Sequence, residues 1–272
     1  MTRQLNKDTT VCMSLAARPS NFGTRFHNFL YEALGLDYLY KAFTTTDLAG
    51  AIGGVRALGI RGCAISMPFK EACIPMVDEL DASAKAINSV NTLVNTAGHL
   101  KAYNTDYIAI AKLLAQHQVP NDLVFALRGS GGMAKAVVCA LKDAGFQNGF
   151  IVARNEAAGR RLADLYGFSW QPDMAQVQAG LLINVTPIGM AGGAEAATLA
   201  FAEAAIEGAQ VIFDVVALPA QTPLIQYAQA HGKQVITGAE VFAIQAVEQF
   251  VLYTGVRPND ELFQQAAQFA RG

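Results

Sequence analysis

Charge is scarce in this chain of 272 residues, and long apolar runs are missing. Asp, Glu, Lys and Arg make up 15% of the residues, and the formal net charge is -2. No basic cluster indicates a nucleic-acid surface or a membrane patch. No apolar run approaches the ~18 residues that a spanning helix needs, and the opening MTRQLNKDTT lacks the apolar centre of a signal peptide. The sequence therefore predicts a cytoplasmic protein with neither nucleic acid nor membrane as a partner.

The four cysteines and four histidines show no metal-binding or redox pattern. No two cysteines form a C-x-x-C pair, and Cys12, Cys63 and Cys139 lie in apolar runs, as buried thiols usually do. The histidines are scattered, and none joins a group with ligand spacing. We therefore expect structural cysteines and no metal site.

What the sequence does contain is apolar residues, at 52%, in strand-like and helix-like segments that alternate. The expected strands are residues 9–15, 37–43, 62–67, 123–127, 149–153, 180–185 and 210–216. The expected helices between them are residues 24–34, 47–58, 69–80, 106–116, 132–144 and 156–166. This alternation is typical of α/β proteins with parallel sheets.

A break in the alternation of strands and helices near residue 107 predicts two domains. SVNTLVNTAGHLKAYNTD (residues 89–106) indicates two strands joined by a short turn, which departs from the β-α alternation. Two further helices are expected near residues 240–254 and 259–270, where they would pack back on the first domain. The predicted domains are residues 1–106 with 240–272, and residues 107–239.

A glycine cluster follows the first strand of the second predicted domain. Gly129, Ser130, Gly131, Gly132 and Met133 separate a strand from an amphipathic helix. Glycines in this context let the backbone approach a pyrophosphate, which the helix N-terminus then binds. The pattern predicts a Rossmann-type domain that binds a dinucleotide, against the alternative of a plain tight turn.

The end of the next strand helps to choose the dinucleotide. Arg154 stands where an arginine would bind the 2′-phosphate of NADP, against the alternative of an ordinary surface arginine. Glu156 lies close by and keeps NAD as the alternative, because an acid in this region binds the free ribose hydroxyl.

A lysine stands in an unusual place in CAISMPFKEA (residues 63–72). Lys70 falls in the first turn of an expected helix, where the helix dipole favours acids over cations. A nearby carboxylate would keep the ammonium group charged and oriented. Taken alone, Lys70 reads as a solvated lysine, and Asp106 in NTD reads as a helix cap.

Several motifs, in order along nearly the whole chain, resemble those of the shikimate dehydrogenase family, and most closely its divergent shikimate-dehydrogenase-like branch. They are SMPFK (66–70), SVNT (89–92), YNTD (103–106), GSGGMAKAV (129–137), NVTPIGM (184–190), DVVALPAQTPLI (214–225) and QAVEQF (245–250). The resemblance implies an α/β substrate-binding and catalytic domain, a nucleotide domain, and an active site in the cleft. It also implies reduction of 3-dehydroshikimate to shikimate with NADPH, in the shikimate pathway of aromatic amino acid biosynthesis.

The same resemblance assigns roles to single residues. It pairs Lys70, as the acid and base of the reaction, with Asp106. The implied substrate-binding residues are Asn21, Thr24, Ser66, Asn91 and Gln245. Beside the glycine cluster and Arg154, the implied cofactor-binding residues are Asn184, Thr186, Gly189 and Val215.

The chain departs from the family pattern mainly where the substrate carboxylate should bind. Two serines of the family correspond to Asn21 and Gly23, and glycine offers no side-chain donor. Losing a buried hydrogen bond typically costs ~1–3 kcal/mol. The contacts to the substrate carboxylate are therefore predicted to differ from those of the family. Arg18 is a candidate replacement anchor, against the favoured alternative of an ordinary surface arginine. The second basic residue usual in the NADP loop is Ala158 here, which weakens the case for NADP.

We therefore expect a reversible, metal-free oxidoreductase that acts on a small cyclic carboxylate with NADP, or with NAD. Quinate and an aminated shikimate are the alternative substrates. A nucleotide-binding sensor with low turnover is the alternative from another class. The chain is expected to be a monomer or a homodimer.

Overall fold

The structure, a computed structural model, describes residues 4–271, which form two compact units. One unit runs up to Thr105 and resumes at Ala243, and the other is Asp106–Phe242. The sequence analysis placed these limits at residues 106 and 240. Each unit is built around its own six-stranded sheet, and the two are described separately below.

The first unit has a mixed sheet in the order β2-β1-β3-β5-β6-β4. Its strands are β1 (Thr10–Leu15), β2 (Tyr38–Phe43), β3 (Gly62–Ile65), β4 (Glu79–Leu80), β5 (Thr92–Thr96) and β6 (His99–Tyr103). β1 runs parallel to β2 and β3, whereas β5 pairs antiparallel with both β3 and β6. The predicted hairpin of residues 89–106 is thus present as β5 and β6.

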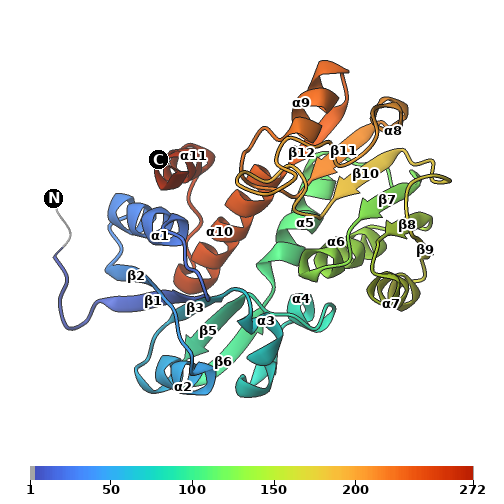
Figure 1. The fold of residues 1–272 in the computed structure, drawn as a ribbon. Coiled ribbons are helices and arrows are strands. Elements are labelled where there is room, and N and C mark those ends of the chain that lie inside the picture. Colours follow the sequence, from blue (N-terminus) through green and yellow to red (C-terminus); the bar gives the residue numbers. More distant parts are fainter. Residues whose placement is uncertain (1–3, 272) are drawn as a thin grey trace. The chain divides into compact units, whose positions relative to one another are not determined.

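Helices cover both faces of this sheet (Figure 1). Those of the first unit are α1 (Phe22–Ala33), α2 (Leu48–Ala57), α3 (Phe69–Ala72), α4 (Ala82–Lys85), α11 (Asp260–Arg271) and the end of α10 (Gly238–Thr254), with a 3-10 turn at Ile74–Met76. Neighbouring strand residues point to opposite cores. Cys12 packs with α1, α10 and α11, while Met13 packs with α2.

The predicted helix over residues 69–80 is wrong beyond Ala72. The chain instead forms a single helical turn, the 3-10 turn and then β4. Pro75 cannot continue an α-helix. The Asp78 carboxylate accepts the backbone N–H of Leu100 at 2.7 Å and pairs with Arg56 at 2.6 Å, which ties this segment to β6.

The second unit has an all-parallel sheet in the order β12-β11-β10-β7-β8-β9. Its strands are β7 (Phe125–Arg128), β8 (Gly149–Val152), β9 (Ser169–Gln171), β10 (Leu181–Asn184), β11 (Val211–Asp214) and β12 (Gln234–Thr237). Its helices are α5 (Thr105–Gln116), α6 (Gly132–Asp143), α7 (Glu156–Tyr166), α8 (Glu203–Gly208), α9 (Pro223–Ala230) and the start of α10. In chain order the sheet reads 3-2-1-4-5-6, the Rossmann arrangement.

The predicted α/β fold with a Rossmann-type domain is therefore confirmed. Strand order reverses between β7 and β10, and ligands of such sheets bind beyond the strand ends at that point. No helix in the described part of the chain is both long and apolar enough to cross a bilayer.

Candidate active site

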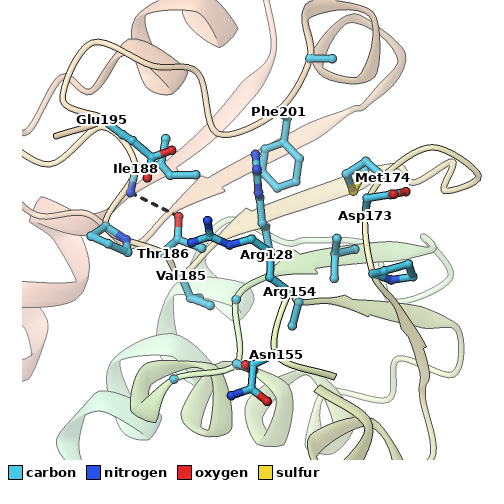
Figure 2. Close-up of a pocket in the computed structure, with 18 residues that line it drawn as sticks. Arg128, Arg154, Asn155, Asp173, Met174, Val185, Thr186, Ile188, Glu195 and Phe201 are labelled. Carbon is cyan, nitrogen blue, oxygen red and sulfur yellow. Dashed lines mark hydrogen bonds between the residues drawn. The ribbon is translucent and has the colours of Figure 1, made fainter. Parts of the chain in front are cut away.

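A cavity of about 610 Å³ opens in the second unit where strand order reverses (Figure 2). Its walls come from the ends of β7 and β8, the segment after β9, and the long segment that follows β10. The residues lining it include Arg128, Gly129, Ser130, Gly131, Arg154, Asn155, Asp173, Met174, Thr186, Ile188, Glu195 and Phe201.

The glycine cluster leaves room for a ligand at the head of α6. A Cβ on Gly129 would lie 2.8 Å from a methyl group of Val185, and the φ of Gly129 is +123°, so this turn requires glycine. At Gly131 and Gly132, by contrast, a Cβ would meet no atom within 4 Å. No side chain caps the helix at Gly131. Free backbone donors beside open space fit the pyrophosphate of a dinucleotide.

The wall formed by Thr186 and Ile188 is held from beneath by Asn184. The Asn184 side chain, which is fully buried, accepts hydrogen bonds from the Thr186 backbone at 3.0 Å and hydroxyl at 2.6 Å. Its amide group donates to the Ile188 carbonyl at 3.1 Å and to Asp214 at 3.0 Å. A bond from the Ile188 N–H to the Thr186 hydroxyl, dashed in Figure 2, closes the wall.

Asp214 anchors this network at the end of β11. Its carboxylate also accepts the Thr222 hydroxyl at 2.6 Å and the Val216 N–H at 3.1 Å. Burial raises the pKa of Asp214, and these hydrogen bonds oppose the rise. Asn184 and Asp214 therefore shape the cavity without facing it.

The predicted cofactor-binding residues divide into those that line the cavity and those that do not. Gly129, Ser130, Gly131, Arg154 and Thr186 line the cavity. Gly132, Met133, Asn184, Gly189 and Val215 are not among the residues that line it. Gly189 has a φ of +87°, and Val215 donates its N–H to the Asn184 carbonyl at 2.9 Å, so both belong to the supporting turns.

In the first unit, main-chain hydrogen bonds bring three predicted site residues to one edge of the sheet. Ser66 directly follows β3 and donates its N–H to the Leu15 carbonyl at 2.9 Å. The Lys70 carbonyl accepts the Val90 N–H at 3.0 Å, and the Asn91 carbonyl accepts the Ile65 N–H at 2.7 Å.

Asn91 is buried, and its amide nitrogen is the more informative of its two polar atoms. The oxygen accepts from the Thr92 hydroxyl at 2.8 Å and from the Thr105 N–H at 2.8 Å. The nitrogen has no hydrogen-bond partner among the described residues. An unpaired buried donor is costly, and it marks a place where a ligand acceptor fits.

Asp106 directly follows Thr105, so the chain sets it close to Asn91. Its side chain is 4% exposed. Lys70 is half-buried in α3, which is only four residues long. The expected conflict between lysine and a helix dipole is therefore weak, because one turn carries little dipole.

The other predicted substrate residues surround the same edge or its neighbouring loop. Asn21 immediately precedes α1, and its exposed side chain makes no capping bond. Thr24 lies in the first turn of α1, and Arg18 is exposed in the loop before it. Gln245 lies on α10 one turn before Gln249, so the two share a helix face.

Sequence reasoning missed Gln249 and Arg128. Gln249 donates to the Thr92 hydroxyl at 3.0 Å and to the Asn91 carbonyl at 3.3 Å. Its place four residues after Gln245 was the available signal. Arg128 lines the cavity of the second unit, and the signal there was a cation ending an otherwise apolar strand.

Comparison with known proteins identifies the family. The chain is 59% identical over 267 residues to the shikimate dehydrogenase-like protein of Haemophilus influenzae, an alignment that covers 98% of both chains. The chain belongs to the shikimate dehydrogenase family. It is also 34% identical to the NADP(+) shikimate dehydrogenase of Streptococcus uberis, over 90% of this chain and 91% of that one.

The family assignment agrees with the domain and structure comparisons. Residues 22–93 match the shikimate dehydrogenase substrate binding domain. The crystal structure of the Thermus thermophilus shikimate 5-dehydrogenase, in complex with NADP(H) and shikimate, aligns with a TM-score of 0.85 and 28% identity over 96% of this chain and 99% of that one. The resemblance inferred from the ordered motifs is thus confirmed. Across residues 4–271, no group of three or more His, Cys, Asp or Glu is placed to hold a metal ion.

Proposed function

We propose that this protein is an oxidoreductase that exchanges a hydride between NADP(H) and the ring ketone or alcohol of a shikimate-like carboxylate. The observation that carries the proposal is the buried, unpartnered amide nitrogen of Asn91 beside the sheet edge that bears Lys70. A hydroxylated ring offers the acceptor that this donor lacks. Membership of the shikimate dehydrogenase family and the open cradle at Gly131 support the nucleotide half of the reaction.

Lys70 is proposed as the acid and base, with Asp106 as its partner. Bound NADPH supplies the hydride for reduction. As the ketone becomes an alkoxide, the Lys70 ammonium donates a proton to its oxygen and balances its developing charge. In the oxidation direction the neutral amine takes the proton back. The buried Asp106 carboxylate is proposed to pair with the Lys70 side chain and orient it.

Asn91 and Gln245 are proposed to bind the ring hydroxyls, with Ser66 beside them. Asn21 and Thr24 would hold the substrate carboxylate together with backbone donors. Gly23 provides no side-chain contact there, so the substrate is proposed to be shikimate or a close relative with an altered acidic group. Quinate and an aminated shikimate remain the alternatives.

The cavity residues are proposed to hold the dinucleotide, from the pyrophosphate at Gly131 to the adenosine at Arg154. The reaction requires the nicotinamide end of the bound dinucleotide to meet a substrate held in the first unit. A low-turnover nucleotide sensor would need only the cavity. The buried, unpaired amide nitrogen of Asn91 and the neighbouring Lys70 favour an enzyme, because a sensor would need neither group.

The proposal is tested by assaying the purified protein with NADPH and NADH against 3-dehydroshikimate, 3-dehydroquinate and an aminated analogue. The reverse reactions are run with shikimate and quinate. We expect turnover on at least one ring, followed at the absorbance of the reduced nicotinamide. Nucleotide binding without turnover on any of them would favour the sensor and reject the enzyme.

A further inference from the structure

Arg128 is a cation at the end of a strand that is otherwise buried and apolar. The preceding β7 residues, Phe125, Ala126 and Leu127, are each 0% exposed. Arg128 is half-buried, and its side chain reaches the nucleotide cavity. Placing a guanidinium there takes it partly out of water, which is costly unless it has a polar or anionic partner.

Arg128 and Arg154 line the same cavity from two neighbouring strand–loop junctions. Arg128 is the partner of Val152 in the parallel pairing of β7 with β8. Arg154 lies in the bend two residues past the end of β8. Arg128, Val152 and Arg154 all line the cavity, and Figure 2 shows both arginines among the side chains that surround it.

Neither guanidinium is neutralised by the protein. Within residues 4–271, no carboxylate lies within 4.0 Å of the side-chain nitrogens of Arg128 or Arg154. Arg128 donates one N–H to the Ala200 carbonyl, which leaves further donors on its fork. Of the two acids that line the cavity, Asp173 uses one carboxylate oxygen to accept the Ala175 N–H at 2.9 Å.

Neither arginine of the nearby helix α7, Arg160 or Arg161, is among the residues that line the cavity. Arg160 binds Glu156 at 2.7 Å and lies over the Trp170 ring, 4.3 Å from its centroid. Ala158, where a second basic residue was expected, donates its N–H to Asn155 at 3.0 Å. The cavity therefore has two uncompensated arginines, both from strand ends.

We propose that Arg128 and Arg154 together bind the 2′-phosphate on the adenosine ribose of the dinucleotide. This rests on the proposed dinucleotide-binding function. The end of β8 is where a Rossmann fold meets that part of the ribose, and the guanidinium fork suits phosphate oxygens. Arg128 then takes the place of a basic residue on α7 and makes the site select NADP(H) over NAD(H).

The test uses two ligands that differ only in the 2′-phosphate, adenosine 2′,5′-bisphosphate and adenosine 5′-monophosphate, titrated by calorimetry. Arg128→Met should weaken the bisphosphate about 10- to 100-fold, as expected for a charged hydrogen bond, and the monophosphate by less than about threefold. Arg154→Met should behave alike. Arg161→Met, which removes an exposed arginine of α7, is the matched control and should leave the ratio of the two affinities unchanged.

If Arg128 served only to hold Ala200 and its segment, both ligands would weaken equally, and the proposal would be wrong. An unchanged ratio would overturn it as well. Should Arg128→Met fail to fold, Arg128→Lys replaces it: a single ammonium should lower the ratio by about threefold or more, and no change counts against the proposal. If the native protein binds neither ligand nor NADPH, the dinucleotide function itself fails.

Discussion

At the scale of single residues, the two polar atoms of the Asn91 side chain differ in their surroundings. Its oxygen is saturated by Thr92 and Thr105, while its nitrogen has no partner in the described structure. The motif SVNT predicted Asn91 as a substrate-binding residue. The motif could not show whether the amide oxygen or the amide nitrogen was free of partners. That depends on Thr105, which follows β6 and donates to the oxygen.

The variant Asn91→Asp tests the role of the amide nitrogen separately from that of the oxygen. The change keeps an oxygen for Thr92 and Thr105 and removes the donor proposed to meet the substrate. We expect kcat/KM for the best substrate of the panel to fall about 10- to 100-fold, measured in steady-state assays. Thr92→Val is the control, because it removes the Thr92 bond to the Asn91 oxygen, together with the bond that Gln249 donates to Thr92, and leaves the Asn91 nitrogen intact. Equal losses in both variants would reduce Asn91 to a structural role.

Arg128 and Asn184 mark the limit of residue-level prediction. Arg128 follows an apolar run, and its access to the cavity depends on pairing with Val152, which a linear sequence does not reveal. Asn184 was predicted to bind the cofactor, whereas the structure sets it 0% exposed beneath Thr186. Motifs predict which residues belong to a site, but the packing decides which of them face it.

At the scale of elements, strands were predicted better than the connections between them. All seven predicted strands are present, because apolar runs bounded by glycine or polar residues identify buried strands well. The helix over 69–80 failed because the Asp78 contacts with Leu100 and Arg56 lie far along the chain. Short elements such as β4, β9 and α8 carry too few residues for a periodic signal.

Helix α1 contains a histidine whose burial has a consequence for stability. His27 is 1% exposed and stacks on Tyr40 with ring centroids 4.3 Å apart. Its Nδ1 atom has no hydrogen-bond partner among the described residues. Burial lowers the pKa of His27 from 6.5 to about 3, so the folded protein keeps the ring neutral while the unfolded chain protonates it.

The native protein should therefore lose stability as the pH falls from 6.5 towards 3, by about 1.4 kcal/mol per pH unit for this one group. His27→Phe keeps the ring stack and removes the proton site. We expect the free energy of unfolding of the native protein to fall relative to that of His27→Phe by about 2 kcal/mol between pH 7 and pH 5. Urea unfolding at both pH values measures it.

His231→Phe is the control for that experiment, because it removes a histidine that is well exposed. A difference between native protein and His27→Phe that stays constant from pH 7 to pH 5 would show that His27 is not the group responsible.

At the scale of the whole molecule, the predicted α/β fold with two domains is confirmed, and one of the two units of the structure is discontinuous in the chain. The parallel order of the second sheet follows from its β-α alternation, and the return of the C-terminal helices follows from where the Rossmann pattern ends. The substrate could not be predicted, because Gly23 and Asn21 remove the family contacts without showing what replaces them.

The central claim is that Lys70 moves the proton that accompanies hydride transfer. The most direct measurement is the single-turnover rate of NADPH oxidation with the best substrate, in native protein and Lys70→Met, together with the NADPH dissociation constant. Lys85→Met, an exposed lysine of the same unit, is the control. The rate should fall about 10²- to 10⁴-fold in Lys70→Met while the dissociation constant stays within about threefold. A Lys70→Met rate equal to the native one would contradict the claim.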